Sequence, residues 1–183
     1  YCVVQELPSG ETGIRHTVVT RSPLRKLIED EFPEIEDVAR WIYTDRTVVQ
    51  HKDKKFYTEE GAIYLVDPNF LTFFTFEMIS GDPETALQKP NSIILAESTA
   101  LKYFERLDVG GEKLTLWNDH EFVVTGITKD PPNNSSLKYE ALASSDIYDW
   151  DTNWDVGGAT FIKLSEHTRP EHLEMKFPAF INT

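Results

Sequence analysis

The chain has 183 residues, and its 31 acidic and 18 basic side chains give a formal net charge of -13. This charge repels phosphate backbones and anionic lipid surfaces, so nucleic-acid binding is disfavoured. The 40% hydrophobic fraction predicts a folded core, arranged as one domain or as two small lobes. Stretches without charge are far shorter than the roughly 20 apolar residues of a membrane helix, so none is expected to cross a bilayer. The one cysteine, Cys2, leaves the redox compartment undecided.

The N-terminal part predicts two short strands and one helix. Strand-like runs at 3–5 and 17–20 flank a turn-rich loop at 8–13. Ser22-Pro23 indicates a helix start, and Pro33 ends the helix. The residues expected on its apolar side are Leu24, Leu27, Ile28 and Phe32.

A β-hairpin and an aromatic segment follow. Two longer strands, 38–50 and 55–66, are expected to pair around the polar turn 51–54. Asp67-Pro68 has the form of a helix cap. The aromatic residues after it are expected to form the core of a second lobe, and they are Phe70, Phe73, Phe74 and Phe76.

The central segment predicts a helix, a strand and a second helix. Asp82 is a candidate N-cap with Pro83 at the first helical position of a short helix that ends near Leu87. A buried strand is expected at 92–96, and Ser98 is expected to cap the next helix. The apolar face of that helix consists of Ala100, Leu101, Tyr103 and Phe104.

The C-terminal third predicts a hairpin, a loop, a strand and a helix. Gly110-Gly111 ends the preceding helix, and 112–117 is expected to pair with 121–128 across a turn at 118–119. A loop at 131–136 precedes a strand at 159–164. The final helix has Thr168 and Glu171 as a capping box, Leu173, Phe177 and Phe180 facing inward, and Pro178 as a kink or an end.

The order of several motifs resembles one known family. These motifs are Asp67–Phe70, Ser80–Leu87, Pro90–Phe104 and Val123–Pro132, within a match that runs from Pro33 to about Phe180. Together they are similar to the MacB-like periplasmic core domain of ABC-transporter permeases of the FtsX-like family. The resemblance implies a domain outside the inner membrane, between the first and second transmembrane helices of a parent permease.

The resemblance also implies an α+β fold with two lobes. Residues 1–66 and 156–183 would form a membrane-proximal strand-helix-strand lobe, and 67–155 an inserted α+β lobe. The chain starts without an initiator Met, as an excised fragment would, and relatives continue to a further strand after it. The first lobe is therefore expected to have an open strand edge.

The implied role is mechanical or binding, with no catalytic, cofactor-binding or metal-binding residue. The parent would be a homodimer with a cytoplasmic ATPase, and this domain would transmit ATP-driven conformational change, engage a periplasmic partner or substrate, or do both. Two alternatives stay open. A stand-alone extracellular binding or adhesion module could use Tyr148, Trp150 and Trp154 as an aromatic platform. A hydrolase could assemble its site from acidic residues distant in sequence.

The acidic segment 149–155 begins like a calcium loop, with oxygen ligands at alternate positions. The sixth position, which should be Gly, is Trp154, and the twelfth, which should be Glu, is Thr160. We therefore interpret it as a solvated acidic turn with Trp150 and Trp154 packed inward.

Four further patterns predict no chemistry. Thr99 and Lys102 have the spacing of a nucleophile and a base but lack the accompanying motifs. Gly110-Gly111 follows a helix and is no phosphate loop. The sequons at Asn133 and Asn134 are interpreted as turn formers. The histidines lack metal-ligand spacing, and they are His16, His51, His120, His167 and His172.

Overall fold

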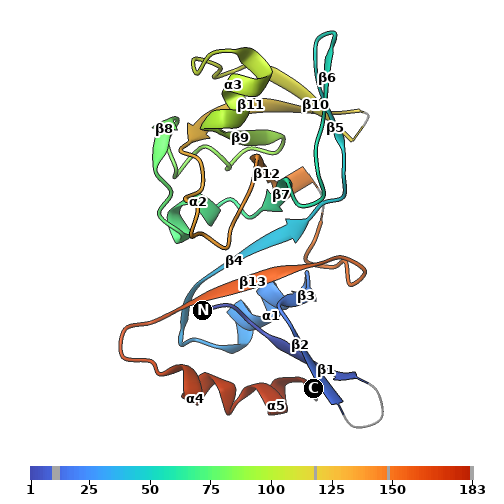
Figure 1. Cartoon of the computed structure of the whole chain (residues 1–183). Helices are drawn as coiled ribbons and strands as arrows, with labels where there is room; N and C mark the ends of the chain where they lie inside the picture. The colour runs from blue at the N-terminus through green and yellow to red at the C-terminus, as the bar shows by residue number, and fades with distance from the viewer. Residues whose placement is uncertain (10–12, 118, 148, 182–183) are drawn as a thin grey trace. The chain divides into compact units, whose positions relative to one another are not determined.

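The computed structural model describes residues 1–9, 13–117, 119–147 and 149–181, which form two compact units (Figure 1). Unit 1 combines Tyr1–Arg40 with Asp151–Thr183, and unit 2 is the continuous segment Trp41–Trp150. Helices and sheets occur in both, which confirms the α+β class. The sequence-derived lobes divide at 66/67 and 155/156. In the structure both boundaries lie earlier in the chain, at 40/41 and 150/151. The strands between 48 and 66 pair with strands formed by later residues of unit 2, so they belong to that unit.

Unit 1 is built on a sheet in the order β3-β13-β4, with a separate β1-β2 hairpin. Its strands are β1 (Gln5–Ser9), β2 (Gly13–Thr17), β3 (Val19–Arg21), β13 (Gly157–Leu164) and the first part of β4 (Ile35–Tyr43). Its helices are α1 (Leu24–Glu31), α4 (Pro170–Glu174) and α5 (Phe177–Ile181). Residues 1–3 extend the β3 edge, since the Val3 amide donates to the Thr160 carbonyl at 2.9 Å. The loop expected at 8–13 is shorter than predicted, because residues 8, 9 and 13 pair within the β1-β2 hairpin.

The helices of unit 1 cover one apolar cluster. Ile28 of α1 and Phe32 at its C-cap are buried there, and the rings of Phe177 and Phe180 lie 5.3 and 5.2 Å from that of Phe32. Leu27, expected in this cluster, is 40% exposed. The buried stripe follows every fourth position from 24 to 32, and residue 27 falls off that stripe.

The C-terminal helix differs from its predicted form. The N-cap is Arg169 and not Thr168, whose hydroxyl lies 3.0 Å from that of Ser165. The helix stops after 174 and resumes as α5 with Pro178 in its first turn, where a proline is tolerated. The helix is thus interrupted at 175–176, ahead of Pro178, and not at the proline itself, which the sequence predicted to kink or end it.

Unit 2 contains a larger mixed sheet, in the order β4-β7-β12-β9-β11-β10-β5-β6, with β8 also paired to β11. The strands after the end of β4 are β5 (Val48–His51), β6 (Lys54–Tyr57), β7 (Ile63–Val66), β8 (Met78–Ser80), β9 (Ser92–Ala96), β10 (Lys113–Leu116), β11 (His120–Thr128) and β12 (Ala141–Ser144). Its helices are α2 (Phe70–Phe73), α3 (Glu97–Phe104) and the 3-10 turn η1 (Ser145–Ile147). Both predicted hairpins, β5-β6 and β10-β11, are confirmed; Asn118 of the second turn lies outside the described residues.

The two long strands predicted before residue 66 are each divided. The segment 44–47 separates β4 from β5, and 58–62 separates β6 from β7. This division lets β4 and β7 pair with each other while β5 and β6 pair at the far end of the sheet, beside β10. The aromatic segment contributes only in part to the core of unit 2. Phe70 is buried and the ring of Phe76 lies 5.8 Å from it, whereas Phe74, whose ring is 4.9 Å from that of Phe70, is 38% exposed.

Three predicted helix caps of unit 2 are not helix caps in the structure. Asn69 precedes α2, while the buried Asp67 accepts a hydrogen bond from Ser145. Asp82 caps only a turn, because 83–87 does not form a helix. Ala96 is the N-cap of α3, and Ser98 lies inside the helix. Leu101, expected inward, is 45% exposed because Ala100 and Tyr103 occupy the buried face.

Candidate functional site

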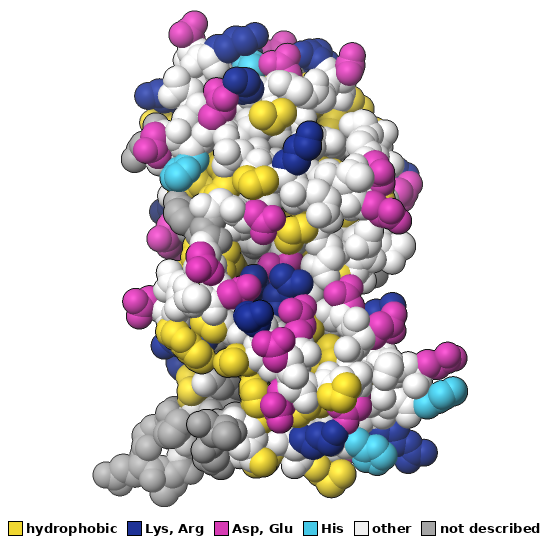
Figure 2. Space-filling model, turned by 180° about the vertical axis from the view of Figure 1, so that it is seen from behind, with side chains coloured by type: hydrophobic (Ala, Val, Ile, Leu, Met, Phe, Trp, Pro, Cys, Tyr) yellow, Lys and Arg dark blue, Asp and Glu magenta, His cyan; other side chains and the backbone are white. Residues whose placement is uncertain are grey.

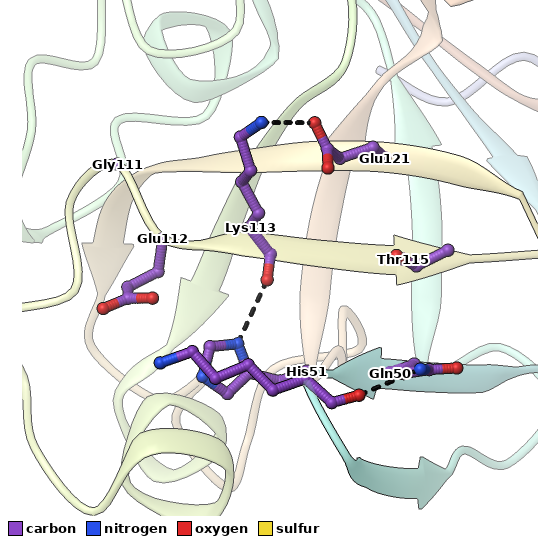
Figure 3. Close-up of a pocket in the computed structure, with 8 residues that line it drawn as sticks. Gln50, His51, Gly111, Glu112, Lys113, Thr115 and Glu121 are labelled. Atoms are coloured by element: carbon purple, nitrogen blue, oxygen red, sulfur yellow. Dashed lines mark hydrogen bonds and ion pairs between the residues drawn. The ribbon is translucent and has the colours of Figure 1, made fainter.

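A hollow of about 410 Å³ lies on unit 2 over β5, β10, β11 and the 111–112 turn (Figure 3). The turn and the paired strands bring together residues from three separate parts of the sequence. Gln50 faces Thr115 across β5 and β10, and Thr115 faces Glu121 across β10 and β11. The result is a polar row across the surface of the sheet.

Both acidic side chains of this hollow are paired with basic ones. Lys113 Nζ lies 2.7 Å from a carboxylate oxygen of Glu121, and Glu112 accepts a hydrogen bond from Arg106. His51 Nδ1 lies 3.1 Å from the Lys113 carbonyl oxygen, which only accepts, so the histidine proton is on Nδ1. This geometry suits reversible polar contacts and aligns no nucleophile with a base.

A second hollow, of about 510 Å³, lies on unit 2 near the start of α3 and carries several carboxylates. Glu140 accepts hydrogen bonds from Lys102 and from the Tyr103 hydroxyl, each at 3.2 Å. Burial, followed by the charge of Glu140, raises the pKa of Tyr103, which stays protonated as the donor. Asp130 accepts the Ser98 amide at 2.9 Å. Two of the carboxylates therefore hold α3 in place.

The acidic segment 149–155 is tied into the fold. Asp151 lies 2.9 Å from Arg40, whose side chain is 6% exposed and also donates to the Ser22 carbonyl at 2.7 Å. Trp150 is half-buried and donates to the Ser145 carbonyl at 2.7 Å. Trp154 was expected to pack inward, but its indole faces solvent and is 57% exposed. Tyr148 lies outside the described residues. Across the described part of the chain, no three His, Cys, Asp or Glu side chains are grouped to hold a metal.

The remaining candidates lie apart from one another. Thr99 is buried, while Lys102 is committed to Glu140. Gly111, at φ +85, forms the turn between α3 and β10. Asn133 and Asn134 lie in an exposed turn. The histidines are on separate elements or turns, and only His51 lines a hollow described above.

Sequence reasoning did not foresee that the motifs carrying the family resemblance contact one another. Gly81 lies against Thr125 and Gly126, with so little space that an added Cβ would be 2.6 Å from the Thr125 carbonyl oxygen. The Thr125 hydroxyl donates to the Ala86 carbonyl at 2.7 Å. With the contact between Ser98 and Asp130, these motifs define how β8, β9, α3 and β11 assemble.

Charges of both signs occur on the face of the molecule seen from behind. Figure 2 shows acidic and basic side chains intermixed over the face seen from behind. Several charged side chains are paired across strands, such as Lys163 with Glu36 at 2.6 Å, and Lys54 of β6 pairs with Glu105 at the end of α3 at 3.1 Å. No helix in the described ranges is both long and apolar enough to cross a membrane.

Comparison with known proteins identifies one family. Residues 3–179 match the model of the MacB-like periplasmic core domain. A comparison with curated proteins gives no match. Among solved structures, a domain of a protein described as a permease, from Porphyromonas gingivalis, is 23% identical with a TM-score of 0.79, over 99% of this chain and 79% of its own.

Two further structures share the fold. The periplasmic region of MacB from Actinobacillus actinomycetemcomitans is 16% identical with a TM-score of 0.65, over 88% of this chain and 72% of its own. The extracellular domain of the noncanonic ABC-type transporter YknZ from Gram-positive bacteria is 9% identical with a TM-score of 0.61, over 97% and 86%. At these identities the structures establish the fold, and the family match rests on residues 3–179.

Proposed function

Because the chain belongs to the MacB-like periplasmic core domain family of ABC-transporter permeases, we propose that it transmits ATP-driven conformational change in a dimeric permease. The family identifies the chain as a periplasmic portion of an inner-membrane protein. In the proposed complex, two copies face each other outside the membrane and a cytoplasmic ATPase drives them. Engagement of a periplasmic partner or substrate would accompany this motion.

The division into two compact units carries this proposal. Each unit has its own buried core, and the chain passes between them at 40/41 and at 150/151. Compact units of this kind are a common basis of domain motion.

A reversible crosslink in the parent protein tests the proposal. Ile14 and Met175 of unit 1 are 64% and 72% exposed, so each can be replaced by Cys in a Cys2→Ser background. The reconstituted permease with its ATPase is treated with a reducible bifunctional reagent, and a monofunctional reagent of the same chemistry serves as the control. We expect the crosslinked dimer to bind ATP, to hydrolyse it slowly and to recover on reduction. Unchanged hydrolysis, with the crosslink verified on a gel, would contradict mechanical coupling.

The alternative of a stand-alone adhesion module has weaker support in the structure. Of the three aromatic residues expected to form its platform, Trp154 is exposed, Trp150 is half-buried and bonded to Ser145, and Tyr148 lies outside the described residues. The flanking gene sequence distinguishes the two proposals. Membrane helices before Tyr1 and after Thr183 support the permease, whereas a secretion signal alone supports the module.

A further inference from the structure

The β1-β2 hairpin is an insertion within one edge strand of unit 1. The Val3 amide donates to the Thr160 carbonyl of β13 at 2.9 Å. Val19, the first residue of β3, faces Ala159, which is the next residue along β13. Residues 3 and 19 therefore occupy consecutive positions opposite β13, and the chain between them contains the hairpin, which is a separate two-stranded sheet (Figure 1). The edge strand would be continuous without it.

The hairpin adds nothing to the buried core of unit 1 among the described residues. No described side chain of β1 or β2 is buried, and Ile14 of β2 is 64% exposed. A two-stranded hairpin by itself is marginally stable in water, and a third strand with an apolar face stabilises it. The hairpin therefore stands to gain stability from contact with another molecule.

The two outer edges of the hairpin differ in their capacity to pair. β1 contains Pro8, which has no amide N–H, and proline makes an edge strand a poor template for further pairing. β2 contains no proline, so its outer edge keeps the amides and carbonyls that a further strand needs. In the described part of the chain, β2 pairs with β1 alone.

The side chains of β2 indicate what a further strand would carry. Arg15 and Ile14 lie on opposite faces, because successive side chains of a strand alternate. Glu6 lies 3.6 Å from His16, whereas Arg15 has no ion-pair partner within the described ranges. A strand with acidic side chains on the Arg15 face and apolar side chains on the Ile14 face is complementary to β2. A second copy fits less well, since pairing β2 with itself about its centre places two Arg15 side chains opposite each other.

We propose that β2 is a docking edge for an extended segment of another periplasmic protein, one that alternates acidic and apolar residues and adds a third strand to the hairpin. In recognition of this kind, backbone hydrogen bonds provide affinity and the alternating side chains provide specificity. The inference names the partner that the proposed function leaves open, and to that extent it rests on that function. Its test uses the isolated chain, so its failure would leave the crosslinking test of mechanical coupling unaffected.

A titration with short peptides tests the docking edge. The probe alternates glutamate and valine and has blocked ends. One control peptide has lysine in place of glutamate, and the other is the probe N-methylated throughout, which lacks amide donors. Amide NMR spectra of the isotope-labelled chain are recorded in about 0.15 M salt, which screens its net charge beyond about 8 Å. We expect the probe to shift the signals of 13–17, to slow their exchange with solvent and to bind on the order of tenfold more tightly than either control.

Charge reversal separates docking on β2 from general attraction. In Arg15→Glu the lysine peptide should bind more tightly than the probe, and in Arg15→Gln the two should bind about equally. Lys55→Glu makes the same reversal on β6, an edge strand of unit 2, and should leave the preference for the probe unchanged. Circular dichroism verifies that each variant is folded.

Three results would overturn the proposal. The first is the absence of shifts at 13–17 with the probe, and the second is an unchanged preference in Arg15→Glu. The third is a shift of these signals with the concentration of the chain alone, which would show that a second copy occupies the edge.

Discussion

Replacing Gly81 by Ala should destabilise unit 2 far more than the same replacement at Gly111. The two glycines have nearly the same backbone conformation, with φ of +88 and +85. An alanine in this region costs about 1 to 2 kcal/mol at either position. An added Cβ at Gly81 would lie 2.6 Å from the Thr125 carbonyl oxygen and 2.9 Å from the Gly126 Cα, while at Gly111 it would have no atom within 4 Å.

The difference in unfolding free energy between Gly81→Ala and Gly111→Ala measures the cost of placing a Cβ where two backbones lie close together. Overpacking against atoms that cannot rotate away costs about 1 to 3 kcal/mol. We therefore expect Gly81→Ala to lose about 2 to 5 kcal/mol of unfolding free energy and Gly111→Ala about 1 to 2 kcal/mol. Gly126→Ala tests the same approach from the other side, since its Cβ would lie 2.7 Å from the Ser80 carbonyl oxygen.

Urea unfolding followed by tryptophan fluorescence gives these free energies. The double variant of Gly81 and Gly126 should lose less than the sum of the single losses, because both substitutions relieve their clashes by separating the same backbones. Equal losses in Gly81→Ala and Gly111→Ala would refute the reasoning, as would full additivity in the double variant.

Three more outcomes are expected. Asp82→Ala should lose about 1 kcal/mol without a change of fold, because the carboxylate accepts the Glu84 amide within the turn, and an unchanged denaturation midpoint would show that this hydrogen bond does not stabilise the fold. Calorimetry should detect no calcium binding tighter than about millimolar in 149–155, where one carboxylate is committed to Arg40. The hydrogen bond from Lys176 lowers the pKa of Glu34, so its contribution to stability is present above the usual pKa of a glutamate and is lost as the pH falls through the lowered value. Between neutral pH and about pH 3, the parent should therefore lose more unfolding free energy than Glu34→Gln, and identical losses would count against the pair.

Local sequence patterns predicted the elements that local interactions determine. The β5-β6 hairpin turns at the polar pair Lys52-Asp53, and α1 has a regular apolar stripe that ends before Pro33. In contrast, β12 reads Ala-Leu-Ala-Ser and has the composition of a helix. It is a strand because β7 and β9 pair with it on both sides, which no neighbouring residue reveals.

Two of the predicted helix caps, Ser98 and Asp82, were wrong because residues other than the capping side chain decide the local structure. Ser98 has a good capping side chain, but its amide is bound by Asp130, 32 residues away. The segment after Asp82 stays a turn because it lies between Pro83 and Pro90, with too few residues to nucleate a helix.

The hollows and the pair of Arg40 with Asp151 could not be predicted for a related reason. The first hollow combines residues near 50, 112 and 121, and Arg40 is 111 residues from Asp151. The motifs behind the family resemblance identified the family correctly. The structure shows that they encode backbone contacts of unit 2, such as that of Gly81 with Gly126, and they identify no ligand.

The discontinuity of unit 1 has a consequence for synthesis on the ribosome. The first 40 residues emerge before 41–150, and the β13 strand that completes their sheet emerges only after that segment. At typical elongation rates the wait is on the order of 10 s, during which the apolar stripe of α1 lacks its cover. Unit 2 is continuous and can fold as it is made. Nascent unit 1 is therefore the part of this chain that chaperones and proteases encounter with its apolar surface uncovered.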